Sequence, residues 1–144
     1  MEILLISHDG IASGAKKSAE LILGPQENLH VIELTAVGGV GGFATELIQY
    51  LSSKTKESQN VIIISDLKNG SPYNTAVSYI INNDLADKVS LLTGMNLNMV
   101  LETIMLDGDS VTGIELNTVI GTAIDGISMM QPSDYNTAIS TGDE

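Results

Sequence analysis

One histidine, His8, lies at a position in the sequence where a functional residue is expected. It follows an apolar run, residues 3–6, that is typical of a parallel strand buried on both faces. Apolar residues at helical spacing begin a few positions later, so His8 lies between a first strand and a first helix. Ligands of open α/β sheets bind at the carboxyl ends of the strands, and an imidazole there can supply a nucleophilic nitrogen. A solvent-facing turn histidine would occupy the same position.

A second loop contains the other residues whose types suggest chemistry. Asp66 follows the apolar run 61–64, and Gly70, Ser71 and Pro72 come at the end of the loop. Serine followed by proline indicates a helix start, with Ser71 as the N-cap and Pro72 at the first helical position. Free backbone N–H groups and the helix dipole at such a start form an anion site. In most proteins a Ser-Pro pair is only a helix cap, so the interpretation as an anion site depends on other functional residues lying close to it.

The elements that position these loops alternate between strand and helix along the chain. This alternation predicts an α/β fold, a doubly wound and mainly parallel four-stranded sheet with helices on both faces. In the common order, 2-1-3-4, the first strand lies between the second and the third, and the switch point separates the first from the third. We therefore expect His8 and Asp66 to face each other. The expected strands are 2–6, 29–34, 61–64 and 89–92, with a possible short strand at 127–130, and the expected helices are 13–23, 43–54, 72–81, 97–106 and 114–124.

Together, these residue types fit phosphoryl transfer through histidine. His8 can supply the attacking nitrogen, while Asp66 can accept the proton of the other ring nitrogen and stabilise positive charge on the ring. Ser71 and the helix start at Gly70 and Pro72 can hold the phosphoryl oxygens. The sequence shows no metal-ligand cluster, so we expect transfer without a metal and without a cofactor. The other histidine, His30, lies within an expected strand and is interpreted as a strand-face residue.

The composition limits the possible partners and the location. The chain has 144 residues, enough for one domain, with 43% hydrophobic residues and no cysteine. No apolar run approaches the length of a membrane span and no signal peptide is visible, so a cytoplasmic protein without membrane insertion is expected. The net charge is −12, with 18 acidic residues. This acidity argues against nucleic acid and anionic lipid and suits a basic protein partner.

Three stretches, in this order, resemble a known family. They are residues 7–10 (Ser-His-Asp-Gly), residues 66–74 (Asp-Leu-Lys-Asn-Gly-Ser-Pro-Tyr-Asn) and residues 94–103 (Gly-Met-Asn-Leu-Asn-Met-Val-Leu-Glu-Thr). They resemble the mannose-family enzyme IIA of the bacterial phosphoenolpyruvate:sugar phosphotransferase system. The resemblance covers residues 1–131 as one domain and leaves 132–144 as an acidic, flexible tail.

The resemblance implies a function and a set of partners. Such a protein is a cytoplasmic homodimer that accepts a phosphoryl group from the histidine phosphocarrier protein and passes it to a IIB domain of the same permease. By position, His8 matches the phosphorylated histidine, Asp66 its aspartate partner, and Ser71 the serine near the phosphoryl oxygens. The segment 127–130 matches a strand exchanged between the two subunits.

Two stretches depart from the family pattern. Asn98 stands where the family usually has proline, and residues 37–42 replace a turn of proline, glycine and an acidic residue. Both departures affect loop shape and partner docking.

Three other interpretations remain open, two from the residues alone and the third within the resembling family. A receiver-like signalling domain would be phosphorylated on Asp66, but it needs further acidic residues beside Asp9 and a lysine after a fifth parallel strand. A dinucleotide-binding module would use the glycine pattern of residues 39–44, which matches often by chance. A phosphotransfer subunit of a dihydroxyacetone kinase would share the histidine chemistry.

Overall fold

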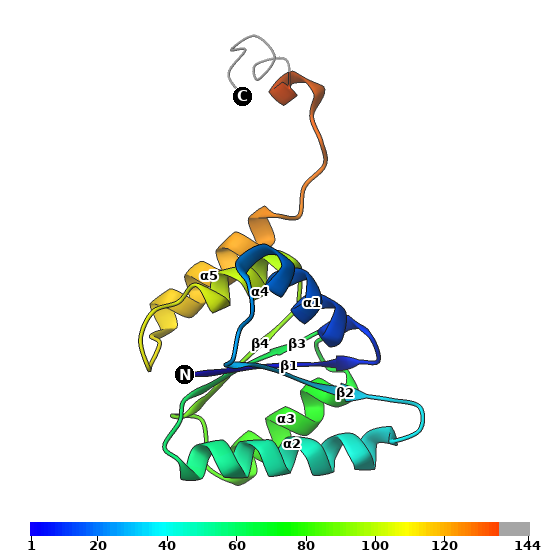
Figure 1. The fold of residues 1–144 in the computed structure, drawn as a ribbon, viewed down its shortest axis with the longest axis vertical. Helices are drawn as coiled ribbons and strands as arrows, with labels where there is room; N and C mark the ends of the chain where they lie inside the picture. Colours follow the sequence, from blue (N-terminus) through cyan, green and yellow to red (C-terminus); the bar gives the residue numbers. More distant parts are fainter. Residues whose placement is uncertain (136–144) are drawn as a thin grey trace.

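Four parallel strands form one sheet, and their order is the one predicted. The computed structural model describes residues 1–135. The strands are β1 (Glu2–His8), β2 (Leu29–Leu34), β3 (Val61–Ser65) and β4 (Val89–Thr93), in the order β2-β1-β3-β4 (Figure 1). β1 extends two residues further than predicted because Ser7 and His8 pair with the last residues of β2. His8 is therefore the terminal residue of a central strand.

Helices cover both faces of the sheet, which completes the predicted doubly wound architecture. The helices α1 (Ile11–Leu23), α4 (Leu97–Ile104) and α5 (Gly113–Asp125) lie on one face, and α2 (Gly39–Lys56) and α3 (Ser71–Asn82) lie on the other (Figure 1). Side chains of β1 alternate between the two layers. Ile3 and Leu5 join the core under α1, α4 and α5, whereas Leu4 and Ile6 join the core over α2 and α3. Burial on both faces explains why the central strands are continuous apolar runs.

The sequence predicted a helix from residue 43 after a glycine-rich loop at 35–42, but residues 39–42 are already helical. α2 begins at Gly39, after an N-cap at Gly38 whose backbone N–H donates to the Thr35 hydroxyl at 3.0 Å. Glycine disfavours helix by about 1 kcal/mol per residue relative to alanine. The buried side chains of Phe43, Leu47 and Leu51 fix the helix on the sheet, and the helix extends back from them through the glycines.

The possible short strand at 127–130 is not formed. These residues leave the end of α5 without regular structure and lead away from the body of the domain (Figure 1). A strand requires the backbone of a neighbouring strand, and nothing in the described part of the chain lies alongside this segment. Most of the expected tail, residues 136–144, lies outside the described residues, while residues 132–135 form a helical turn. None of the helices within residues 1–135 is both long and apolar enough to span a membrane.

Candidate functional site

His8 and Asp66 are in direct contact, as the strand order predicted. β1 and β3 are paired neighbours, so the end of β1 lies beside the residue that follows β3. The Nδ1 atom of His8 lies 2.8 Å from Oδ2 of Asp66, and the backbone N–H of His8 donates to the same oxygen at 3.0 Å. One carboxylate oxygen therefore orients both the ring and the backbone of His8. The His8 side chain is 44% exposed, whereas that of Asp66 is 6% exposed.

This contact determines which ring nitrogen is available. An ionised carboxylate can only accept hydrogen bonds. In a neutral His8 the ring proton is therefore on Nδ1, and this N–H donates a hydrogen bond to Asp66. Nε2 is then the unprotonated nitrogen with a free lone pair, and it makes no hydrogen bond to any residue in 1–135. The geometry therefore presents a nucleophilic nitrogen to solvent at the switch point of the sheet.

The other oxygen of Asp66 has no hydrogen-bond partner among the described residues. Oδ1 is buried, and the backbone N–H of Asp66 is tied to the carbonyl of Ile6 at 3.2 Å. A buried anion with few hydrogen bonds is poorly solvated, which strengthens its interaction with any nearby positive charge. The ring of His8 is the side chain positioned to carry that charge.

The start of α3 differs from the prediction in a way that matters for anion binding. Gly70, not Ser71, is the N-cap; Ser71 is the first helical residue and Pro72 the second, and no side chain caps the helix. The backbone N–H groups of Ser71 and Tyr73 donate to no other group in residues 1–135. Because a serine inside the helix does not cap these groups, they and the Ser71 hydroxyl remain available to an anion.

Gly70 brings this helix start close to the histidine. A Cβ atom added at Gly70 would lie 3.1 Å from Cε1 of His8 and 3.2 Å from the carbonyl oxygen of Leu67. The absence of a side chain at this position thus allows the loop to approach the imidazole edge. The preceding residue, Asn69, has a φ of 66°, which lets the loop turn sharply into α3.

The start of α1 is closed to anions by Glu33, a residue that the sequence analysis missed. Oε2 of Glu33 accepts hydrogen bonds from the backbone N–H groups of Gly10 at 3.0 Å and Ser13 at 2.9 Å. The Ser7 hydroxyl accepts a third bond, from Ala12 at 2.8 Å. An acidic residue near the end of the second strand was the available signal, because that strand end lies beside the start of α1. Of these two helix starts beside His8, the one at α3 is uncapped.

His30 lies near the amino ends of the strands, away from His8, and on the strand face as interpreted from the sequence. Its Nε2 atom is 2.7 Å from Oε2 of Glu2, and its ring packs 5.4 Å from the ring of Tyr50, centroid to centroid. Lys54 also approaches Glu2, with 3.6 Å between Nζ and Oε1. His30 is therefore part of a charged cluster at the amino end of β1, remote from His8.

Asn98, where the family pattern has proline, packs its side-chain amide against Gly126 at the end of α5. The neighbouring Asn96 caps α4 by accepting the N–H of Met99 at 2.9 Å and donates to the carbonyl of Ala123 at 3.0 Å. These two asparagines fix the end of α5, from which the segment 127–130 departs.

The fold is that of an open α/β protein with a parallel sheet, and an oriented histidine lies at its switch point beside an uncapped helix start. Such an arrangement is suited to binding a small anion. The family model described as "PTS system fructose IIA component" (EIIA-man) matches residues 2–120. The chain therefore belongs to the EIIA-man family, the fructose- and mannose-type IIA components of the phosphotransferase system. Family membership gives it a general role in phosphoryl transfer for sugar transport.

Individual relatives agree with this assignment. The sorbose-specific EIIA component of Lacticaseibacillus casei is 31% identical over 102 residues, which cover 71% of this chain and 70% of that protein. The mannose-specific EIIAB component of Escherichia coli (strain K12) is 28% identical over 117 residues, covering 79% of this chain and 34% of that protein. The chain thus spans about a third of that relative's length.

Solved structures agree as well. The IIA protein associated with the fucose utilization operon of Streptococcus pneumoniae superposes with a TM-score of 0.77 at 27% identity, covering 89% of this chain and 91% of that one. The mannose/sorbose-specific IIA subunit of Enterococcus faecalis has the same fold, with a TM-score of 0.76 at 22% identity, covering 90% of this chain and 94% of that one.

Proposed function

We propose that this protein carries a phosphoryl group on Nε2 of His8, accepting it from the histidine phosphocarrier protein and passing it to a IIB domain. The observation that carries the proposal is the hydrogen bond from Nδ1 of His8 to Asp66, which leaves Nε2 as the free nucleophile. Family membership supports the reaction class, and the contact between His8 and Asp66 supports the choice of residue and atom.

The transfer step is an exchange of one N–P bond for another. The Nε2 lone pair of His8 attacks the phosphorus held on the donor histidine, and the donor ring leaves with the electrons of its own N–P bond. His8 then holds the phosphoryl group on Nε2 and a proton on Nδ1, so its ring becomes a cation beside the carboxylate of Asp66. No proton has to leave Nε2, and the step needs no metal ion. The Ser71 hydroxyl and the N–H groups of Ser71 and Tyr73 stabilise the phosphoryl oxygens.

An apolar rim around His8 supports docking of a protein donor. Ile11, Val37, Val40 and Leu67 are large, exposed side chains on the loops and helix starts at this edge of the sheet. Contact between two proteins excludes water from the transfer site, which strengthens its electrostatic interactions. The net charge of −12 favours a donor with a basic surface.

The assignment of His8 is tested with a matched pair of histidine variants. His8→Ala and His30→Ala are each incubated with phosphoenolpyruvate, enzyme I and the phosphocarrier, and acid-labile phosphoryl uptake is measured. We expect His30→Ala to be phosphorylated and His8→Ala to take up no phosphoryl group. An acid-labile group on His8→Ala would contradict the proposal. An alkali-labile group on that variant would favour the receiver-like interpretation on Asp66.

We further propose that the protein is a homodimer in which the segment 127–130 pairs with the other subunit. Ile127, Met129 and Met130 are exposed in the single chain, which is unfavourable for three neighbouring apolar side chains. β4 is an edge strand with one unpaired side in the described sheet. Beside it is an apolar hollow of about 210 Å³, lined by Tyr73, Val77, Ile80, Ile81, Ala86, Val89 and Leu91. Added pairing at this edge would satisfy the backbone of β4 and bury apolar surface.

One charged substitution in the segment 127–130 tests the dimer without disturbing the fold of the single chain. Met129→Glu changes an exposed side chain, so it should leave the monomer folded and shift the mass measured by light scattering from dimer to monomer. Met105→Glu, at an exposed methionine just after α4, is the matched control and should remain dimeric. A monomeric wild type at micromolar concentration would contradict the proposal.

A further inference from the structure

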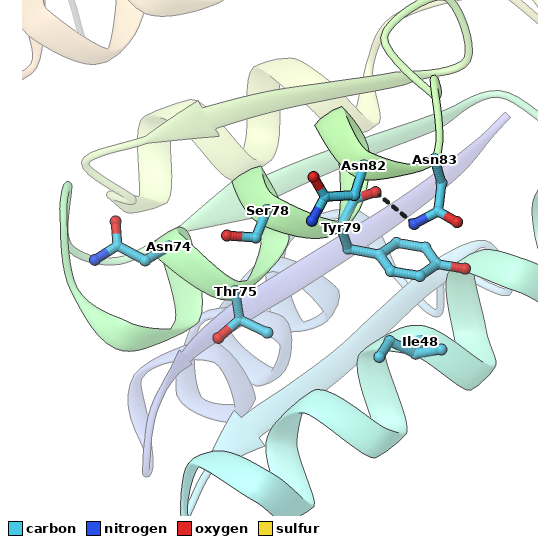
Figure 2. A pocket seen from close by; sticks show the side chains of 7 residues that line it. All are labelled: Ile48, Asn74, Thr75, Ser78, Tyr79, Asn82 and Asn83. Atoms are coloured by element: carbon cyan, nitrogen blue, oxygen red, sulfur yellow. Dashed lines mark hydrogen bonds between the residues drawn. The ribbon is translucent and has the colours of Figure 1, made fainter.

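A hollow between α2 and α3 has a lining that suits a small ligand. Its volume is about 410 Å³, within the range of about 300–1,000 Å³ that is typical of small-molecule sites. Ile48 of α2 and Tyr79 of α3 form its apolar side (Figure 2). The remaining lining residues are polar, and all belong to α3 or to its C-cap: Asn74, Thr75, Ser78, Asn82 and Asn83.

The polar groups of the hollow are neutral, and two of the five polar side chains are free to bind, whereas Asn74, Thr75 and Asn83 each donate to a backbone carbonyl. None of the lining residues carries a formal charge at neutral pH, although the chain has 18 acidic residues. The side chains of Ser78 and Asn82 make no hydrogen bond to any residue within 1–135. Each hydroxyl or amide offers both a donor and an acceptor. Asn83 is partly engaged, since its amide donates to the carbonyl of Tyr79 at 2.9 Å (Figure 2).

Tyr79 provides an apolar surface that is held in place. Tyr79 packs against the buried core that lies between the sheet and the helices α2 and α3, and its ring extends over Ile48 in the hollow (Figure 2). An aromatic ring beside amide and hydroxyl groups matches a molecule that has apolar C–H faces and a rim of hydroxyl groups. The ring loses little conformational freedom when such a molecule binds.

Other ligand classes fit the lining less well. An anion would find no cationic side chain among the lining residues of the hollow. A cation would find no carboxylate to pair with. A purely apolar ligand would remove water from the amides without replacing its hydrogen bonds. We therefore propose that this hollow binds a neutral, polyhydroxylated small molecule of monosaccharide size.

One lining residue connects the hollow to the loop beside His8. Nδ2 of Asn74 donates to the carbonyl of Asn69 at 3.0 Å, and Asn69 precedes the Gly70 that packs against the His8 ring. A ligand that hydrogen-bonds to the Asn74 amide alters this contact, so binding in the hollow reaches the loop. Binding itself does not depend on phosphoryl transfer, so the two proposals can fail separately.

The test is a titration of the unphosphorylated protein followed by ¹H–¹⁵N NMR. The probes are D-mannose and D-fructose at millimolar concentrations, with D-mannose 6-phosphate as the charged comparison. We expect at least one neutral sugar to cause saturable shifts at Asn74, Ser78 and Asn82, accompanied by shifts at Asn69 and Gly70. The sugar phosphate should bind more weakly than the neutral sugar.

Surface variants then identify the groups responsible. Ser78→Ala and Asn82→Ala should each weaken binding by roughly fivefold, the effect of losing one net hydrogen bond. Gln49→Ala removes an exposed amide of α2 outside the lining and should leave affinity unchanged. Asn74→Ala should abolish the response of Asn69 and Gly70 while shifts at Ser78 persist.

Several results would overturn the proposal. Among them are no saturable shifts with either neutral sugar, equal or tighter binding of the sugar phosphate, and unchanged affinity in both Ser78→Ala and Asn82→Ala. Shifts that follow protein concentration instead of sugar concentration would identify the hollow as an interface between copies of the chain. Shifts confined to the hollow would overturn the connection to the loop.

Discussion

Replacing Asp66 with asparagine tests whether its charge, and not only its hydrogen bond, stabilises a phosphorylated His8. The amide oxygen of the variant can still accept from Nδ1 and from the backbone N–H of His8, which both now reach one carboxylate oxygen. The orientation of the ring is therefore largely retained. What is lost is the negative charge beside the imidazolium that forms when Nε2 carries a phosphoryl group.

The size of the loss follows from the geometry. At a separation of 2.8 Å the attraction between unit charges is about 6 kcal/mol at an effective dielectric constant of about 20. The half-exposed ring of His8 is screened by water, and the retained amide hydrogen bond returns about 1 kcal/mol. The net cost is about 2–3 kcal/mol, or roughly 30- to 150-fold in the phosphorylation equilibrium.

The assay measures how one phosphoryl group distributes between the phosphocarrier and this protein at equilibrium. Limiting phosphoenolpyruvate is supplied, the reaction is quenched in alkali, and both phosphoproteins are quantified. Asp9→Asn is the matched control, because it removes the same charge from an exposed residue beside His8. We expect the Asp9 variant to lie within about twofold of wild type, as an exposed charge pair contributes little.

Two results would refute this reasoning. If Asp66→Asn retains the wild-type equilibrium, the carboxylate only orients the ring. If Asp9→Asn loses as much as Asp66→Asn, the effect comes from overall charge and not from the Asp66 contact. A parallel thermal melt separates stability from function. The new amide N–H₂ takes the place of the buried Oδ1, which has no partner in the described part of the chain, and it costs about 1–3 kcal/mol of stability if it finds no acceptor.

Three further predictions follow from other contacts. Gly70→Ala places a methyl group 3.1 Å from Cε1 of His8. The rate of phosphoryl transfer should fall by roughly tenfold, which is about 1.4 kcal/mol in the barrier, while the far-ultraviolet circular dichroism spectrum stays unchanged. A wild-type rate would contradict the importance of this contact. Burial raises the pKa of Tyr50, with a smaller contribution from the charge of Glu2, so stability should fall as pH rises above about 10, where the unfolded tyrosine ionises. Tyr50→Phe removes a buried hydroxyl that has no hydrogen-bond partner within residues 1–135. It should reduce that fall in urea titrations and leave neutral-pH stability equal or higher, and an unaltered pH profile would contradict it. Finally, transfer from the phosphocarrier should slow as salt rises, and a salt-independent rate would show that the net charge of −12 does not steer docking.

Much of the architecture could be predicted because the apolar pattern is strong. Both faces of the central strands are buried, so β1 and β3 appear in the sequence as continuous apolar runs. Alternation of such runs with helical periodicity leaves few topologies, and the common one brings His8 and Asp66 together. The resemblance of the Asp66 loop to a family then gave the reaction class.

The errors arose where backbone hydrogen bonding depends on distant residues. The glycines of 39–42 favour a loop locally, but the packing of Phe43 and Leu47 on the sheet extends α2 through them. The segment 127–130 has an apolar pattern, but a strand also needs a neighbour's backbone, and a single chain does not supply one here.

The sequence alone determined the fold class, the chemical types at the switch point and the family, because these depend on residue identity and on the order of residues. Only the tertiary structure decided which helix start is open to an anion. The start of α1 is closed by Glu33, which reaches it from a neighbouring strand, and the start of α3 is open because Gly70, not Ser71, is its N-cap. Local propensity favours serine as a cap. The close approach of the loop to His8 favours the residue without a side chain at that point, which moves the cap by one residue. The backbone N–H groups of Ser71 and Tyr73 are then left without an acceptor among residues 1–135.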